Sequence, residues 1–269
     1  MSNKVKLRIL YGILALSIVS ILGFGAILAI EFYTLNRAQS FFGEIAAPFM
    51  PRPIFANEIS LAEPTEDTET QPDLNLTNDD PSASFIDFDL HKENFPNIVG
   101  WIQSEGTNIN YPIVQFTDND FYLHHLPDGT RNRMGSIFLD YRNASNFSDL
   151  NIIIYGHDTP SGDKFGSLRH YRDENYFRNH DTMFIFTPEQ DYIVLIFAAY
   201  ILDSAVEVPP MHFTSEQHFD DYIQDIRRRS NFTSDVQVMF EDRLVFLATC
   251  VPAGAVNDRF IIVGKMLPI

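Results

Sequence analysis

Short apolar runs separated by turn-forming residues dominate the chain from about residue 95 onward. They are rich in Ile, Val, Phe and Tyr, as strands are, and helical spacing is rare between them. Several runs are apolar almost without interruption, so we expect both of their faces to be covered. Eight such runs predict a mainly β fold, a closed or nearly closed eight-stranded barrel. The runs are NIVGWIQ, NYPIVQ, GSIFLD, NIIIYGH, TMFIFTP, DYIVLIFAAYIL, RLVFLATC and RFIIVGKM.

One segment before the run RLVFLATC has helical rather than strand periodicity. Thr214, with Gln217 three positions later, predicts a capping box at the start of a helix of about 15 residues. Apolar residues then recur at helical spacing, which predicts one face packed on the barrel. These residues are Phe219, Tyr222, Ile223 and Ile226.

The N-terminal region contains an uncharged apolar stretch from Ile9 to Ile30. As a helix its roughly 22 residues would span about 33 Å, which matches the hydrocarbon core of a bilayer. A cleaved signal peptide is the alternative, but its apolar region is normally about 7 to 15 residues long. Lys4, Lys6 and Arg8 precede the stretch and Glu31 follows it. The positive-inside rule then predicts a cytoplasmic tail over 1–8, a transmembrane anchor over 9–31 and an extracytoplasmic remainder.

Between Pro53 and Leu90 the chain has no lysine or arginine but many Asp and Glu residues among Pro, Thr, Ser and Asn. Repulsion between like charges and the scarcity of apolar residues favour an extended, solvated tether. A specific acidic recognition tail is the alternative. We therefore predict a linker over 32–90 and one folded domain over 91–269.

The formal net charge of −17 results from 19 Lys and Arg against 36 Asp and Glu. Such an acidic protein repels phosphate backbones, so nucleic acid is not an expected partner. The single cysteine cannot form an internal disulfide, and it is buried filler, a link between two copies or a reactive group.

Candidate chemistry lies at the ends of three predicted strands. Cys250 ends the run RLVFLATC, His157 ends NIIIYGH, and Arg259 opens RFIIVGK about eight residues after the cysteine. A thiol needs a nearby base or cation to ionise near neutral pH, and an arginine can donate hydrogen bonds to a developing oxyanion. Taken one by one, a structural histidine and a solvated strand-end arginine are equally reasonable. The other seven histidines end no clear strand, and no Cys and His cluster suits zinc.

Together, however, three motifs resemble the signature of the sortase family: YGHD at Tyr155 to Asp158, LATC at Leu247 to Cys250 and NDRF at Asn257 to Phe260. Two longer segments and the helix before the cysteine strand resemble class B sortases in particular. These segments are GSIFLDYRN from Gly135 to Asn143 and NIIIYGHDTPSGDKFGSLRHY from Asn151 to Tyr171. The resemblance covers roughly Phe95 to Met266.

The resemblance implies a barrel of about eight strands with an N-terminal helical segment, held on the outer face of a Gram-positive cell membrane by a single N-terminal span. It implies that Cys250 attacks a sorting pentapeptide between its fourth and fifth residues and forms a thioacyl enzyme. His157 would then serve as acid and base, and Arg259 would steady the oxyanion. We expect no cofactor and no metal.

The resemblance also suggests a substrate groove. The run DNDFYL nominates Asn119 and Leu123, and Ala248 and Thr249 flank the nucleophile. Core packing is an equal alternative for Leu123. The sequence departs from common class B residues at Asp158, Ala248 and Val251, which could alter the pKa of His157 or the contacts with substrate.

The expected partners are surface proteins bearing a sorting signal, and a peptidoglycan amine or a pilin lysine as acceptor. Alternatives remain within and beyond this family. One is a pilin-polymerising sortase, and another is a plain cysteine endopeptidase, although papain-like enzymes place cysteine before histidine in the chain. A third is a non-enzymatic adhesin or sensor domain tethered to the membrane. The end of the chain soon after the last strand favours the anchoring role over pilus assembly.

Overall fold

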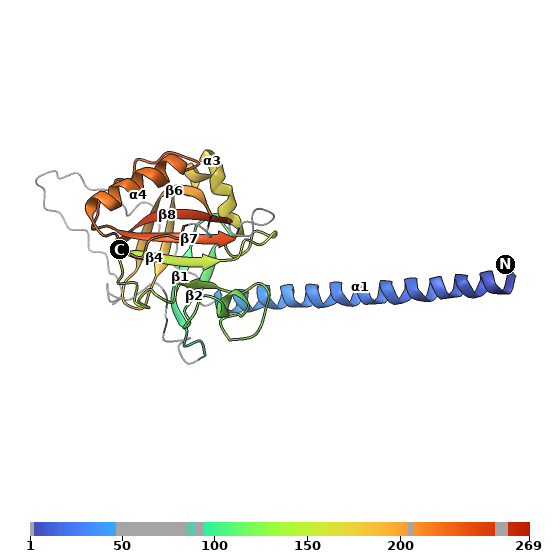
Figure 1. Cartoon of the computed structure of the whole chain (residues 1–269). Helices are drawn as coiled ribbons and strands as arrows, with labels where there is room; N and C mark the ends of the chain where they lie inside the picture. Colours follow the sequence, from blue (N-terminus) through green and yellow to red (C-terminus); the bar gives the residue numbers. More distant parts are fainter. Residues whose placement is uncertain (1–2, 47–85, 87, 89–93, 204–206, 251–257) are drawn as a thin grey trace, which may run out of the picture.

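The computed structural model describes residues 3–46, 86, 88, 94–203, 207–250 and 258–269. Its main feature is a closed barrel in which the strands follow one another in the order β1-β2-β3-β4-β7-β8-β6-β5 (Figure 1). The strands are β1 (Ile98–Gln103), β2 (Asn110–Val114), β3 (Ile137–Leu139), β4 (Asn151–Gly156), β5 (Thr182–Phe186), β6 (Tyr192–Asp203), β7 (Arg243–Cys250) and β8 (Asp258–Pro268). Each lies within or closely overlaps a predicted run, so the predicted barrel is confirmed.

The barrel is mixed in direction. Most neighbouring strands are antiparallel, whereas β2 pairs with β3 and β4 pairs with β7 in parallel. The antiparallel pairing of β1 with β5 closes the barrel. The parallel β4 and β7 pair is long, from Asn151 opposite Leu244 to Gly156 opposite Thr249. It brings together two segments that are far apart in the sequence.

Both faces of the central strands are buried, as their continuous apolar sequence predicted. In β7, Val245 and Leu247 belong to the cluster that fills the barrel. Leu244, Phe246 and Ala248 belong to a second cluster outside it. Because successive strand residues point to opposite faces, a strand covered on both sides must be apolar at every position.

The helix α4 (Glu216–Arg229) lies against the outside of the barrel over β6 and β8 (Figure 1). It covers the second cluster, and Phe219, Ile223 and Ile226 are buried beneath it. The helix and its apolar face are therefore as predicted, but the cap is not. Ser215 is the N-cap, and its hydroxyl accepts a hydrogen bond from His218 N. The next residue after Thr214 caps better because it has the extended backbone of an N-cap and its oxygen reaches the first turn.

Within the described residues, three short helices were not predicted: the 3₁₀ helices η2 (Phe121–Leu123) and η3 (Gly166–Arg172), and α3 (Glu174–Asn179). Helices of so few residues are too short to show a clear periodicity in sequence. The first of them, η2, carries one of the predicted substrate-binding residues, Leu123.

The helix α1 (Asn3–Ala46) is longer than the predicted anchor, and it runs away from the barrel toward the N-terminus (Figure 1). It is long and apolar enough between Leu10 and Ile45 to cross a membrane, and it is consistent with a membrane anchor or a signal sequence. Its most apolar window is not buried against the rest of the protein.

The last turns of α1 pack on the barrel. Ala38 and Phe42 join the cluster that contains Tyr111, and the Phe42 and Tyr111 rings meet edge to face at 5.4 Å. Ile45 packs in another cluster with Trp101. The helix thus continues into the first part of the predicted linker, because an apolar face continues at helical spacing through residues 32–46. Most of the predicted linker, 47–85, 87, 89 and 90, lies outside the described residues, so the acidic tether stays a prediction.

Candidate active site

The three predicted catalytic residues lie at one end of three neighbouring strands, β4, β7 and β8. Cys250 is the last residue of β7, and its main chain pairs with that of Arg259 at the start of β8. The parallel register of β4 and β7 ends with Gly156 opposite Thr249, and His157 follows Gly156 directly. The fold thus brings the main chain of all three positions together, across gaps of about ninety residues and of eight residues in the sequence.

The imidazole of His157 is held by a backbone carbonyl. Its Nε2 lies 2.7 Å from the Leu123 oxygen, and because a carbonyl can only accept, Nε2 carries the proton in this contact. The other ring nitrogen, Nδ1, is then the atom that can accept a proton from a thiol. The same Leu123 oxygen lies close to the main chain of Gly135. Only a glycine fits there, because its φ is +54° and a Cβ atom at this position would lie 2.6 Å from the Leu123 oxygen.

The environment of His157 favours the neutral imidazole. Burial lowers its pKa most, and the hydrogen bond with Leu123 opposes this effect. Repulsion from neighbouring groups, Arg259 among them, lowers the pKa further. In the free protein, His157 is accordingly a base rather than a cation near neutral pH.

The loop after His157 folds back on it. Phe165 N donates to the His157 backbone oxygen at 3.1 Å, and the main chains of Asp158 and Lys164 form an isolated antiparallel β-bridge. The side chain of Asp158 is 7% exposed and lies 3.0 Å from Arg169 Nη2. Burial raises the pKa of Asp158, and the charges of Arg169 and Arg172 only partly counteract this effect. Asp158, which departs from the common class B residue, is thus a buried carboxyl beside the candidate base.

A cleft of about 710 Å³, including space open to solvent, adjoins these strand ends. Of the residues predicted from the sequence, Asn119, Leu123, Ala248 and Arg259 line it. Thr249 does not: successive strand residues point to opposite faces, so its buried side chain points away from the face that Ala248 presents to the cleft. Arg259 is half-buried, and its Nη1 donates to the Asp258 oxygen at 3.3 Å.

Several lining residues were missed. Tyr155 lies in the quoted motif YGHD, and its place on β4 two residues before His157, which follows the strand, could have nominated it. Leu202, Val208 and Pro209 come from the end of β6 and the segment that follows it, and no local signal marks them. Val251 lies outside the described residues.

Among the residues that the structure describes, no three His, Cys, Asp or Glu side chains gather as a metal ion would require. The arrangement at the strand ends instead offers a base, a cation and a thiol-bearing residue beside a mostly apolar cleft. Such a set can support nucleophilic attack on a carbonyl by a cysteine.

Comparisons with known proteins give a consistent result. The chain is 39% identical over 180 residues to sortase B of Listeria monocytogenes, which covers 66% of this chain and 73% of the relative. It matches the Staphylococcus aureus sortase B–substrate complex with a TM-score of 0.64 and 29% identity, over 68% of this chain and 85% of that one. It matches sortase B complexed with triglycine with a TM-score of 0.62 and 28% identity, over 68% and 86% of the two chains. No protein-family model matches the chain.

Proposed function

This chain belongs to the sortase B family of cysteine transpeptidases, and on that premise we propose that it cleaves the C-terminal sorting signal of surface proteins and transfers the acyl part to a cell-wall amine. Cys250 is the nucleophile, His157 the acid and base, and Arg259 the oxyanion donor. The sorting signal lies in the cleft lined by Asn119, Leu123 and Ala248.

In the first half of the reaction, the thiolate of Cys250 attacks the carbonyl carbon of the scissile peptide bond. Arg259 donates hydrogen bonds to the oxygen that becomes negative, because a guanidinium stays protonated at every relevant pH. His157, protonated at Nδ1 by the thiol, gives this proton to the leaving amine. The carbon–nitrogen bond breaks, and the acyl group stays on the cysteine as a thioester.

In the second half, an acceptor amine attacks the thioester carbonyl and His157 Nδ1 takes the proton that the amine loses. The carbon–sulfur bond breaks, and the thiolate of Cys250 is regenerated. The neutral state of His157 in the free protein suits this step, because only an unprotonated Nδ1 can accept. The hydrogen bond from Nε2 to the Leu123 oxygen keeps the ring in the tautomer that leaves Nδ1 available.

The observation that carries the proposal is the strand register. The pairing of Cys250 with Arg259 and the end of the β4 and β7 pair at Gly156 and Thr249 come from the backbone alone. Strand ends on a closed barrel are rigid, so side chains there can be held to the small tolerances that catalysis requires.

The related structures suggest both substrates. Sortase B from Staphylococcus aureus has been solved as a substrate complex, and sortase B has been solved with triglycine. By analogy, we infer that this chain binds a sorting-signal peptide in its cleft and accepts an amine of the oligoglycine or cross-bridge type. The apolar part of α1 is the single membrane span, with the barrel on the extracytoplasmic side.

The proposal is tested with the full chain in detergent, because the last turns of α1 belong to the folded core. A randomised peptide library first identifies the best-cleaved pentapeptide, and that peptide is then offered with hydroxylamine as the acceptor. A transpeptidase yields the peptide hydroxamate, whereas a strict endopeptidase yields mainly free acid.

Cys250→Ala is expected to abolish hydroxamate formation, and His157→Ala and Arg259→Ala to reduce it by a factor of about 10² or more. His170→Ala is the matched control, because His170 is an exposed histidine in η3 and is not among the residues that line the cleft. Full activity in Cys250→Ala, or an equal loss in His170→Ala and His157→Ala, would disprove the assignment.

A further inference from the structure

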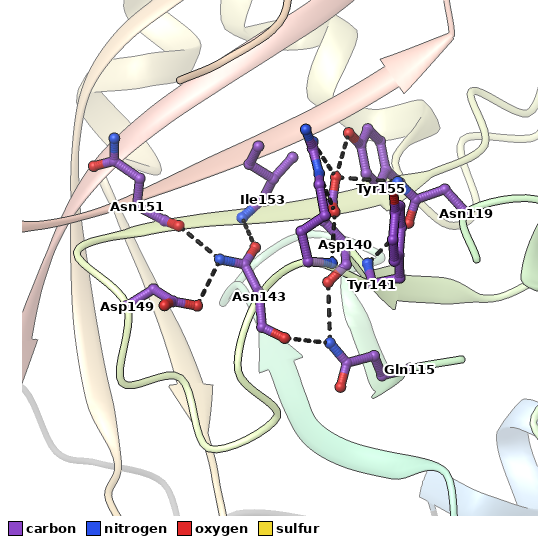
Figure 2. Close-up of polar contacts among 10 residues, drawn as sticks. Gln115, Asn119, Asp140, Tyr141, Asn143, Asp149, Asn151, Ile153 and Tyr155 are labelled. Carbon is purple, nitrogen blue, oxygen red and sulfur yellow. Dashed lines mark hydrogen bonds and ion pairs between the residues drawn. The ribbon is translucent and has the colours of Figure 1, made fainter. Parts of the chain in front are cut away.

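A buried carboxylate stands behind the cleft, at the turn that follows β3. Asp140 is 0% exposed, and its own N–H donates to the Ile153 oxygen on β4 at 2.9 Å. Figure 2 shows its side chain at the centre of a polar network that joins β4, the turn after β3 and the segment before η2. The reaction steps above do not use it.

Three residues donate five hydrogen bonds to this carboxylate. Arg142 supplies its backbone N–H and Nε to Oδ1, at 2.9 and 2.8 Å, and Nη2 to Oδ2 at 2.7 Å. Tyr155 Oη and Asn119 Nδ2 both donate to Oδ2, at 3.0 and 3.1 Å. Both Tyr155 and Asn119 line the cleft, but they come from elements far apart in sequence. The carboxylate of Asp140, which does not itself line the cleft, connects the two by accepting a hydrogen bond from each.

These contacts fix how Asn119 faces the cleft. Its Nδ2 donates to Asp140 while its Oδ1 accepts from Tyr141 N at 3.0 Å. The carboxylate can only accept and the backbone N–H can only donate, so the amide has one possible orientation. The second N–H of Asn119 remains for a ligand. Tyr155 is held in the same way, because burial and the charge of Asp140 raise the pKa of its phenol and keep it a donor.

We propose that Asp140 is a positioning residue that orients Asn119 and Tyr155, and through them determines how well the cleft binds the sorting-signal peptide. The inference rests on the proposed function and deepens it. No hydrogen bond described for Asp140 reaches His157 or Arg259, so its effect falls on peptide binding rather than on the reactive groups.

Asp140→Asn is the main variant, because it keeps the shape but turns an amide N–H toward donors that need an acceptor. Asp149→Asn is the matched control. Asp149 accepts from Asn143 Nδ2 (Figure 2) and from Ala144 N on the other side of the same turn, and none of the hydrogen bonds described for its side chain involves a residue that lines the cleft. Both are made in the full chain and tested with the best-cleaved library pentapeptide and hydroxylamine.

The expected result is a KM for the pentapeptide at least tenfold higher in Asp140→Asn, with kcat lowered less than threefold and Asp149→Asn unchanged. The rate of Cys250 alkylation by iodoacetamide should stay within twofold of wild type, since this reaction needs no peptide. Asn119→Ala should raise KM as well, and the double variant Asp140→Asn with Asn119→Ala should raise it little further, because the two act through the same contact.

Trp101, the single and fully buried tryptophan, reports by its fluorescence whether each variant is folded. Where Asp140→Asn does not fold, Tyr155→Phe and Asn119→Ala decide the question, since each removes one contact to the carboxylate from the cleft side. An unchanged KM in a folded Asp140→Asn, an equal rise in Asp149→Asn, or alkylation slowed in step with cleavage would overturn the proposal. Failure of the proposed function would look different, because the wild-type chain would then show no Cys250-dependent cleavage.

Discussion

Two buried aspartates flank the candidate site, and their carboxyl groups behave in opposite ways. Both lie beside an arginine: Asp140 beside Arg142 at 2.7 Å, and Asp158 beside Arg169 at 3.0 Å. Burial raises the pKa of both carboxyls. For Asp140 the hydrogen bonds from Arg142 and Tyr155 outweigh burial and the pKa is lowered, whereas for Asp158 burial prevails and the pKa is raised.

The difference lies in where the arginine directs its N–H groups. Arg142 donates three hydrogen bonds to Asp140. Arg169 instead donates to the backbone oxygens of Gly166 and Thr159, and Asp158 Oδ1 accepts no hydrogen bond from the described residues. A nearby positive charge alone therefore does not compensate a carboxylate for the hydrogen bonds to water that it loses on burial. N–H groups that point at the carboxylate oxygens do compensate for them.

The largest expected effect is a difference between the two aspartates in how much each substitution changes the free energy of unfolding. Asp140→Asn should lower the free energy of unfolding by about 2–4 kcal/mol, because donors that a buried carboxylate satisfied are left facing an amide. Urea unfolding of the detergent-solubilised chain, followed by Trp101 fluorescence, measures this loss. A change below about 0.5 kcal/mol would show that the network adds nothing to stability.

Asp158→Asn should behave differently in the same assay. Removing a buried, poorly solvated charge relieves a cost, and the lost ion pair with a third-exposed Arg169 is worth little. We expect a change of less than about 1 kcal/mol, toward higher stability at neutral pH. A loss as large as that of Asp140→Asn would contradict the comparison.

The smallest effect is in the pH dependence of stability, where the two residues should show opposite signs. The pKa of Asp140 is lower in the folded protein, so its contribution is present above the unfolded pKa of about 3.9 and is lost as pH falls through the folded pKa. The pKa of Asp158 is higher in the folded protein, so its charged form costs stability above that pKa, and the cost disappears as pH falls toward about 3.9.

Each aspartate variant is therefore compared with wild type by urea unfolding at several pH values between about 7 and about 3. The free energy of unfolding of wild type should exceed that of Asp140→Asn, and this difference should shrink only at the acid end of the range. The free energy of unfolding of wild type should be lower than that of Asp158→Asn, and this difference should shrink at higher pH, between the raised folded pKa of Asp158 and its unfolded pKa. Difference curves with the same sign for both variants would break the comparison.

The eight strands and α4 were predictable because each is marked locally, by an apolar run or by the spacing of Phe219, Ile223 and Ile226. The hairpin that pairs Cys250 with Arg259 was predictable from loop length alone. The order of the strands was not. The parallel pairing of β4 with β7, which brings His157 to the cysteine strand, joins segments about ninety residues apart, and no local pattern encodes it.

The same limit explains why the contacts of Asp140 were not predicted. Asn119 is predicted as a groove residue, but its contact with Asp140 is not: both are ordinary polar residues in turn-like segments, and only the closed barrel places Asn119 Nδ2 3.1 Å from Asp140 Oδ2. Thr249 is nominated because it precedes Cys250, yet strand alternation turns its side chain to the face opposite that of Ala248, which lines the cleft. The continuation of α1 is not predicted, although Ala38, Phe42 and Ile45 have helical spacing, because Glu31 ends the uncharged apolar stretch.

The central claim is that Cys250 carries the acyl group between cleavage and transfer, and mass spectrometry tests it most directly. The full chain is mixed with the best-cleaved pentapeptide without an acceptor, quenched in acid and digested. The account predicts that the peptide containing Cys250 gains the mass of the acyl part, and that hydroxylamine removes it. Turnover of the pentapeptide with no adduct on Cys250, or turnover by Cys250→Ala, would contradict the account.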